Sequence, residues 1–495
     1  MRDNVLQKGT PLFCDLYHLT MAQAWFNDNK HYEDKISEAY FRKCPFGGAY
    51  LIAAGLAEFL EWIENWKVTQ EDINYLETYK GIDDKPLFTE EFLYFLKNSK
   101  LEVNIRSVEE GQIVFPNEPV LVVRGPCWQV DMVEAAFLNI FNSQSLIATK
   151  ASRIVHAAQS DGINHPVLEF GLRRSQELGS FTQTRASFIG GCVATSNVEA
   201  ARAYGIPAKG TMAHSYIMTY ENELDAFKSF MKSAQGNATL LVDTYDTREG
   251  ILNAIKASEE TKIPLQGIRI DSGDLAYWSK EARKLLNEKG FEKTKIVISN
   301  DLDEYSVENI IAVQKACPDI IAAGTKLVTA YDMPALGGVF KVKEVRSQPK
   351  IKIAEGKTTI PGATNVVRIY EDGKFAGDVI VRSTERLVDY ANRLNENLVS
   401  CVQGIEGKKK VFLKGSEAKE LLRDTVIGGK VVQSMKVNDL YKLQNRVREN
   451  LEQLDESHRR LSNPHLYGVG LSEKLLKIQN KMITQHNNIQ KAKEI

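Results

Sequence analysis

The middle third of the chain repeats one pattern: a short apolar run, then a polar or glycine residue. Such runs precede Glu169 (Pro-Val-Leu), Asp243 (Leu-Leu-Val), Asp271 (Gly-Ile-Arg-Ile), Ser299 (Ile-Val-Ile) and Gly324 (Ile-Ile-Ala-Ala). Seven positions mark the rhythm: Glu169, Gly190, His214, Asp243, Asp271, Asn300 and Thr325. Subtracting successive numbers gives intervals of 21, 24, 29, 28, 29 and 25 residues.

This spacing predicts repeated strand–helix units. Buried parallel strands are continuous Val/Ile/Leu runs, and one strand with its crossover helix takes about 30 residues. The polar positions then fall at the carboxyl ends of the strands, where an α/β barrel builds its active site. Any one of them could be an ordinary loop residue, but six successive intervals favour the barrel.

The flanking segments have other patterns and predict three regions. Residues 1–135 combine helical apolar spacing with an alternating hairpin or small sheet over 108–126, and form an N-terminal α+β domain. Residues 136–345 form the irregular α/β barrel, entered by a helix over about 130–160. Residues 346–495 begin with short alternating strands and return to helix after 437. We expect them to complete the flanking domain.

Composition excludes several classes of partner. The 495 residues are 43% hydrophobic and 26% charged, with a formal net charge of −1. A globular protein is expected, and neither nucleic acid nor an anionic membrane is expected as a partner. The six cysteines have no metal-type spacing and no apolar run reaches about 18 residues, so we predict a cytoplasmic protein with free thiols.

His214 is the strongest single candidate for a catalytic residue. It follows a glycine turn in Lys-Gly-Thr-Met-Ala-His, and Asp243 and Asp271 occupy equivalent places in neighbouring units. A carboxylate beside an imidazole fixes its tautomer and raises its basicity, which suits a base or a phosphoryl acceptor. The carboxylates also suit Mg²⁺, although Asp-Ser-Gly-Asp is equally a common turn and helix-cap sequence.

Several later loops could hold a phosphate. Glycines and hydroxyls at Ser299-Asn300, Gly324-Thr325-Lys326 and Gly337-Gly338 would supply backbone N–H groups, and Arg173-Arg174 offers bidentate donors. From the residues alone, the chain is interpreted as a Mg²⁺- and phosphate-handling barrel enzyme with a histidine in its site.

The same segments, in the same order, resemble the nicotinate phosphoribosyltransferase family from residue 12 to about 470. They are DLYHLTMAQAWF, FRKCPFGGAYLIAAGL, EEGQIVFPNEPVLVVRGP, LEFGLRRSQ, IGGCVATSNVEAARAYGIPAKGTMAHSY, IRIDSGDLA, VISNDLDE, AAGTKLVTAYDMPALGGVFK and SHRRLSNPHLY. The resemblance implies a type II phosphoribosyltransferase fold, with an irregular barrel and a flanking domain built from both ends of the chain. It also implies a homodimer with active sites at the subunit contact. Cys14 stands where the family commonly has Thr, a small change that puts no role in doubt.

The resemblance also implies roles for individual residues. His214 would be phosphorylated by ATP, Asp243 would orient it, and Asp271 would face the ribose hydroxyls or Mg²⁺. The remaining implied contacts are Tyr17, Phe170, Arg173 and Thr211 around the pyridine ring and its carboxylate, with Arg269 nearby, and Asn300, Gly324 and Thr325 on the 5′-phosphate. The implied reaction, in NAD biosynthesis, joins nicotinate to 5-phosphoribosyl 1-pyrophosphate with loss of pyrophosphate, driven by ATP hydrolysis.

Substrate choice depends on Ser196. Enzymes for nicotinamide resemble this chain around IGGCVATSNVEA but carry an aspartate where Ser196 falls, and an aspartate repels a carboxylate. A serine can donate to it. Alternatively, Ser196 only caps the helix that follows. The other functions considered are a nicotinamide phosphoribosyltransferase, a decarboxylating quinolinate enzyme (a much shorter family), and an inactive barrel that acts as a binding protein.

Overall fold

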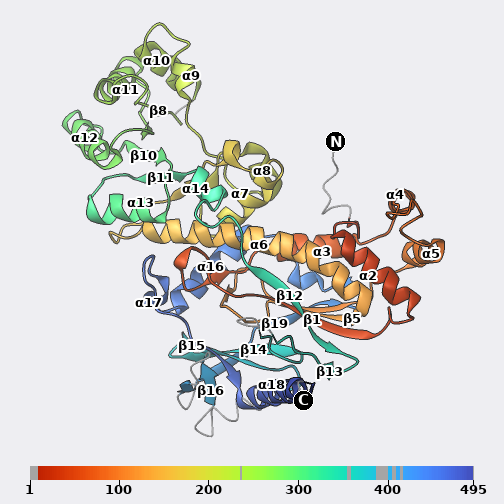
Figure 1. The fold of residues 1–495 in the computed structure, drawn as a ribbon. Coiled ribbons are helices and arrows are strands. Elements are labelled where there is room, and N and C mark those ends of the chain that lie inside the picture. The colour runs from red at the N-terminus through yellow and green to blue at the C-terminus, as the bar shows by residue number, and fades with distance from the viewer. Residues whose placement is uncertain are drawn as a thin grey trace. The chain divides into compact units, whose positions relative to one another are not determined.

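The computed structural model describes residues 9–234, 237–353, 358–385, 400–403, 408–412 and 416–493. Contacts divide the chain into two units (Figure 1). The first contains Met1–Ser145, Leu336–Asp439 and Asn445–Ile495; the second contains Leu146–Ala335 and Leu440–Gln444. The predicted boundaries after 135 and 345 each lie ten residues from these limits (145 − 135 and 345 − 335).

The second unit is built on a six-stranded sheet in which every pair is parallel. The strand order is β7-β6-β11-β10-β9-β8. The strands are β6 (Val167–Glu169), β7 (Ala194–Thr195), β8 (Thr239–Leu241), β9 (Gly267–Ile270), β10 (Lys295–Asn300) and β11 (Ile320–Ala323). The sheet curls into a half-barrel, which is the irregular α/β barrel that the apolar runs predict. Ile268, Ile298 and Ile321 are fully buried, as expected for strands covered on both faces.

Helices follow the strands of this sheet. They are α7 (Gly179–Ile189), α8 (Val198–Tyr204), α9 (His214–Ile217), α10 (Glu223–Ser233), α11 (Thr247–Thr261), α12 (Leu275–Glu288), α13 (Glu304–Glu308) and α14 (Thr325–Val328). Asp246, Asp274 and Asp303 are the N-caps of α11, α12 and α13, and each side chain accepts a backbone N–H of the first turn. In Asp243-Thr244-Tyr245-Asp246 and Asp271-Ser272-Gly273-Asp274, the second aspartate therefore caps a helix. The first aspartate lies near the end of the preceding strand and is free of that capping role.

Five of the seven rhythmic positions lie at a strand end or within two residues after it: Glu169, Asp243, Asp271, Asn300 and Thr325. The other two do not. Gly190 is the C-cap of α7, and His214 begins α9 after the irregular segment 209–213. The intervals were regular there because a short helix and loop occupy about as many residues as a strand–helix unit.

The first unit is built from both ends of the chain, as the resemblance implies. Its seven-stranded antiparallel sheet has the order β13-β12-β1-β5-β3-β19-β20. The strands are β1 (Asp34–Phe41), β3 (Asn104–Val108), β5 (Leu121–Pro126), β12 (Gly338–Val345), β13 (Gln348–Pro349), β19 (Leu422–Ile427) and β20 (Lys430–Val431). Strand β1 pairs with β12 and β3 pairs with β19, so N- and C-terminal segments share one sheet.

A second, mixed sheet of this unit comes from the C-terminal part, in the order β17-β16-β21-β15-β14-β18. Its strands are β14 (Thr364–Glu371), β15 (Lys374–Arg382), β16 (Ser400–Gln403), β17 (Lys408–Val411), β18 (Glu417–Glu420) and β21 (Val469–Ser472). Strand β21 interrupts the helical region predicted after 437. A two-stranded ladder joins β2 (Leu51–Ile52) and β4 (Ile113–Val114).

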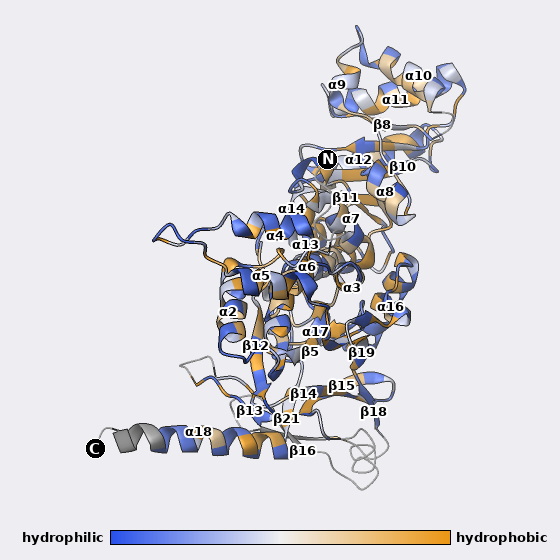
Figure 2. Ribbon diagram, turned by 90° about the vertical axis from the view of Figure 1, so that its right-hand side faces the viewer, coloured by the Kyte–Doolittle hydropathy of each residue, from blue (hydrophilic) through white to orange (hydrophobic). Residues whose placement is uncertain are grey.

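The remaining helices are α2 (Leu16–Asn27), α3 (Leu56–Glu64), α4 (Gln70–Glu77), α5 (Glu90–Asn98), α6 (Cys127–Ala157), α16 (Leu440–Gln453), α17 (Glu456–Arg459) and α18 (Glu473–Lys493). The predicted helix over 130–160 is confirmed as α6. Helix α18 carries both hydrophilic and hydrophobic residues (Figure 2). Within the described residues, no helix has the length and apolar character needed to cross a membrane.

Candidate active site

Arg269 on β9 connects most of the predicted site residues of the second unit. Its Nε donates to Ser299 Oγ (2.7 Å), Nη1 to Thr211 Oγ1 (3.1 Å) and Nη2 to Asp271 Oδ1 (2.8 Å). Its guanidinium carbon lies 5.7 Å from the centre of the Phe170 ring. Three strand ends (β6, β9 and β10) and the 209–213 segment therefore meet at one guanidinium group.

His214 lies beside this cluster. Its Nδ1 is 3.1 Å from Thr244 Oγ1, and its Nε2 is 3.8 Å from Asp271 Oδ2. The side chain is 40% exposed, so a substrate can reach the ring. At 3.8 Å, Asp271 is an electrostatic neighbour of the imidazole and not a hydrogen-bond partner.

Asp243 supports the turn that follows strand β9. Its Oδ2 accepts the backbone N–H of Asp271 (2.8 Å) and the hydroxyl of Ser272 (2.6 Å). Asp243 therefore holds the turn that carries Asp271, and Gly273 allows that turn its positive φ of 72°. In the described structure Thr244 and Asp271 lie against the His214 ring, and Asp243 connects to that ring through the Asp271 turn.

A buried carboxylate supports the Phe170 side of the site. Glu169 is 1% exposed and accepts the hydroxyls of Thr184 (2.9 Å) and Thr195 (2.5 Å) and the backbone N–H of Gly171. Its backbone carbonyl accepts the N–H of Ser196 (2.9 Å). Burying a carboxylate without hydrogen-bond donors costs free energy, so Glu169 holds these partners in place. The bonds therefore fix the backbone that follows β6 and the backbone that follows β7.

Ser196 is not a helix cap. The N-cap of α8 is Asn197, whose side chain accepts the N–H of Ala200 at 3.1 Å. The alternative interpretation of Ser196 as a cap is therefore wrong by one residue. Ser196 is half-buried, and its hydroxyl makes no hydrogen bond with the part of the chain that the structure describes.

The residues predicted to hold a phosphate lie on neighbouring strand ends. Asn300 pairs with Ala323 across β10 and β11, and the carbonyl of Ala323 accepts the N–H of Phe170 (2.8 Å). A Cβ on Gly324 would lie 3.2 Å from the Phe170 carbonyl oxygen, so a larger residue is disfavoured. Asn300 has a φ of 148°, a strained value for a residue other than glycine. Arg173 lies on the short helix η2 (Leu172–Arg174) and is exposed.

Tyr17 belongs to the first unit, whereas the other predicted site residues belong to the second. It is 50% exposed, and its ring is tilted by 38° against the His18 ring, with ring centres 4.1 Å apart. Partial burial, with Glu134 and Asp15 nearby, raises the pKa of its hydroxyl to about 12. The Tyr17 hydroxyl therefore keeps its proton at neutral pH.

Two acidic groups around the site keep unsatisfied oxygens. Asp243 Oδ1 and Glu223 Oε1 are buried and have no hydrogen-bond partner among the described residues. Burial, with Asp243 and Asp246 nearby, raises the pKa of Glu223 above its usual value, although a hydrogen bond from Asn253 opposes the shift. No cluster of three or more His, Cys, Asp or Glu side chains in the described chain could hold a metal. Mg²⁺ commonly uses only one or two carboxylates with water and substrate phosphates, so the orphaned Asp243 oxygen fits that ion.

Thr244 and Ser299 have contacts in the site that the sequence did not assign to them. Each is adjacent to a predicted site residue, and hydroxyls beside a catalytic candidate are too common to single out by type. Only the three-dimensional contacts identify them. Ser299 Oγ, for example, accepts from Arg269 and donates to Asp271 Oδ1 (2.5 Å).

A curled parallel sheet with a polar cluster at its carboxyl edge defines an α/β-barrel enzyme. Three family models match this chain: the nicotinate phosphoribosyltransferase N-terminal domain over 12–142, the family itself over 165–363, and the C-terminal domain over 363–479. A nicotinate phosphoribosyltransferase from Bacillus subtilis is 37% identical over 93% of both chains. The chain belongs to the nicotinate phosphoribosyltransferase family and is an enzyme of that type.

Solved structures agree. The crystal structure of human nicotinic acid phosphoribosyltransferase superimposes with a TM-score of 0.80 and 25% identity, covering 94% of this chain and 99% of that one. A nicotinate-nucleotide pyrophosphorylase from Pyrococcus furiosus has a TM-score of 0.65 at 22% identity, over 92% of this chain and 97% of the other. At that identity the second likeness concerns the fold alone.

Proposed function

We propose that this enzyme joins nicotinate to 5-phosphoribosyl 1-pyrophosphate in NAD biosynthesis. The pyridine nitrogen forms a bond to the anomeric carbon, and the bond from that carbon to the pyrophosphate oxygen breaks with its electron pair. Nicotinate mononucleotide and pyrophosphate are the products. The observation that carries the proposal is the Arg269 cluster, because it joins an aromatic ring, two hydroxyls and a carboxylate around one cation.

The cluster suits a flat anionic substrate. The Phe170 ring provides a surface for stacking a pyridine, and Arg269 and Thr211 provide donors for its carboxylate. Arg173, three residues after Phe170, is exposed and can add a second cation for the substrate carboxylate. As Arg269 is already oriented by Ser299 and Asp271, little side-chain entropy remains to be lost on binding.

His214 is the proposed acceptor of the γ-phosphoryl group of ATP. Asp271 near Nε2 favours a proton on that nitrogen, which leaves Nδ1 with the lone pair that attacks the γ-phosphorus. The bond from that phosphorus to the bridging oxygen breaks with its electron pair, and ADP leaves. The hydroxyl of Thr244 holds Nδ1 until ATP arrives. Phosphohistidine adds about −1.5 to −2 of charge, enough to rearrange the neighbouring turns, and its hydrolysis returns the free ring.

Mg²⁺ would be held by Asp243 Oδ1 and by Asp271, the ligand predicted from sequence. Asp271 has one oxygen engaged by Arg269 and Ser299, so Oδ2 is the one left for a metal or a ribose hydroxyl. Bound Mg²⁺ would neutralise the charge that develops on the leaving pyrophosphate. Asn300, Gly324 and Thr325, on neighbouring strand ends, are proposed to hold the 5′-phosphate.

Ser196 is proposed to favour nicotinate over nicotinamide. Its half-buried hydroxyl has no partner in the described chain and no capping role, so it can donate to a carboxylate oxygen. We further propose a cytoplasmic homodimer in which Tyr17 of one subunit serves the site of the other.

One assay separates the candidate functions. Pyrophosphate release is measured with nicotinate, nicotinamide or quinolinate, each with and without ATP. Release with nicotinate, stimulated by ATP, supports the proposal. Release with nicotinamide alone would assign the nicotinamide reaction, release with quinolinate would assign the decarboxylating one, and no release with any of them would indicate an inactive barrel.

A further inference from the structure

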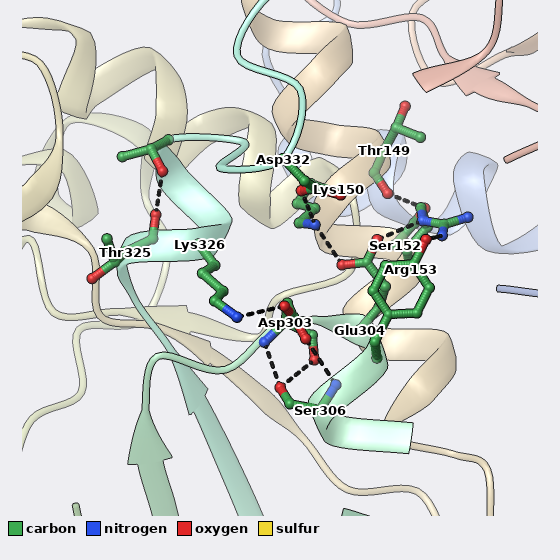
Figure 3. A network of polar contacts seen from close by, with 12 residues as sticks. Thr149, Lys150, Ser152, Arg153, Asp303, Glu304, Ser306, Thr325, Lys326 and Asp332 are labelled. Carbon is green, nitrogen blue, oxygen red and sulfur yellow. Dashed lines mark hydrogen bonds and ion pairs between the residues drawn. The ribbon is translucent and has the colours of Figure 1, made fainter. Parts of the chain in front are cut away.

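Two adjacent acids hold the loop after β11 from both ends. Asp303 and Glu304 start α13, directly after β10, and neither belongs to the cluster around Arg269. The loop comprises residues 324–332 and contains Gly324, Thr325 and the four-residue helix α14. Figure 3 shows the side chains that join the two acids to this loop.

The inner connection is an ion chain that is buried at Lys150 and Glu304 and 39% exposed at Asp332. Lys150 Nζ lies 2.6 Å from Glu304 Oε2 and 2.6 Å from Asp332 Oδ1, near the end of the loop. The side chains of Lys150 and Glu304 are fully buried. Arg153 adds a second cation on Glu304, at 2.7 Å from Oε1. An ion group out of water interacts strongly with its partners and tolerates little displacement.

The outer connection is Asp303 to Lys326, beside Thr325. Lys326 Nζ donates to Asp303 Oδ2 at 2.7 Å, and Asp303 Oδ1 caps α13 by accepting the N–H of Ser306 at 2.8 Å. The hydrogen bond to Asp303 raises the pKa of the Lys326 ammonium, which is therefore charged throughout the neutral range. One carboxylate thus fixes both the start of α13 and the start of α14.

The loop needs such support. A helix of four residues has too few internal hydrogen bonds to be stable by itself. We propose that Asp303 and Glu304 are positioning residues that set the Gly324–Thr325 backbone for the phosphate of the phosphoribosyl substrate. The inference rests on the proposed function, since it assumes that this loop binds the 5′-phosphate.

Isosteric variants distinguish an effect on the position of the loop from an effect on the stability of the whole protein. In Asp303→Asn the amide oxygen can still cap α13, while the charge facing Lys326 is lost. Asp332→Asn removes the negative charge that faces Lys150 at the end of the loop and leaves Glu304 in place. Glu260→Gln is the matched control, because it breaks a Lys228–Glu260 ion pair (3.0 Å) of the same unit that touches no part of the loop.

Steady-state kinetics then give the main result. We expect Asp303→Asn and Asp332→Asn to raise KM for 5-phosphoribosyl 1-pyrophosphate by roughly two- to thirty-fold, the range typical of residues coupled to a site. KM for nicotinate should stay within about twofold, as should the values of Glu260→Gln. Lys326→Met should resemble Asp303→Asn, and the double variant should be no worse than either single one, because both remove the same interaction.

Hydrogen exchange gives a readout that does not need activity. Amides of Leu327, Val328 and Thr329, which bond to carbonyls within the loop, should exchange faster in Asp303→Asn and Asp332→Asn and not in Glu260→Gln. Equal changes in both KM values, or unchanged exchange, would overturn the inference. A wild-type enzyme that releases no pyrophosphate would instead refute the proposed function, and exchange alone would then decide whether these acids hold the loop.

Discussion

Replacement of Arg269 by glutamine tests the centre of the site. The change removes three hydrogen bonds, to Ser299, Thr211 and Asp271, and the ion pair with Asp271. Asp271 keeps its bond from Ser299 but loses the Arg269 guanidinium, its one Lys or Arg partner among the described residues. The pyridine carboxylate also loses its proposed partner.

The size of the effect follows from burial and charge. A hydrogen bond to a charged group contributes about 1.5–3 kcal/mol, and the three bonds here share one guanidinium, so their contributions do not add. The Arg269 side chain is 15% exposed, which lets some water compensate. We expect a loss of about 3 kcal/mol in transition-state stabilisation, or about 150-fold in kcat/KM for nicotinate.

Arg283 offers a matched control in the same unit. It also makes three hydrogen bonds, to the carbonyls of Glu292 and Thr294 and to Asp319 at 2.8 Å, and its side chain is 22% exposed. Arg283→Gln should lower the free energy of unfolding about as much as Arg269→Gln does, by about 1–3 kcal/mol, yet keep kcat/KM within about twofold. Denaturant titration and pyrophosphate release measure the two quantities.

The outcomes are separable. If both variants lose activity in proportion to stability, Arg269 is only a structural arginine and the proposed carboxylate site is elsewhere. If Arg269→Gln is destabilised but fully active, the cluster has no part in catalysis.

Three further results are expected. His214→Ala should abolish ATP hydrolysis and most ATP stimulation while circular dichroism stays that of the wild type; unchanged ATPase activity would remove His214 from the mechanism. Ser196→Asp should reduce kcat/KM for nicotinate far more than for nicotinamide, because a carboxylate facing a carboxylate costs several kcal/mol; equal losses would place the discrimination elsewhere. Mixed Tyr17→Ala and His214→Ala subunits should regain activity through hybrid dimers, and no recovery under proven subunit exchange would favour sites within one chain.

The chemistry of the strand ends was largely readable in the sequence. Apolar runs of three or four residues followed by Glu169, Asp243, Asp271 or Asn300 are strands β6, β8, β9 and β10 with their ends. The inference works because burial on both faces leaves a continuous apolar run, and because parallel strands end at one edge. The prediction of a strand end was wrong at Gly190 and His214. There a helix and a loop together have about the same length as a strand–helix unit.

What the tertiary structure decided is which polar groups meet. Asp243 and Asp271 look alike in sequence, yet one holds a turn and the other faces His214, and the difference arises from the pairing of adjacent strands. The Arg269–Ser299 bond and the Lys150–Glu304 pair join positions that no spacing along the chain connects. Local pattern determines which residues form strands and helices, since it depends on near neighbours. The partners of each charge depend on strand order and helix packing, which only the folded chain establishes.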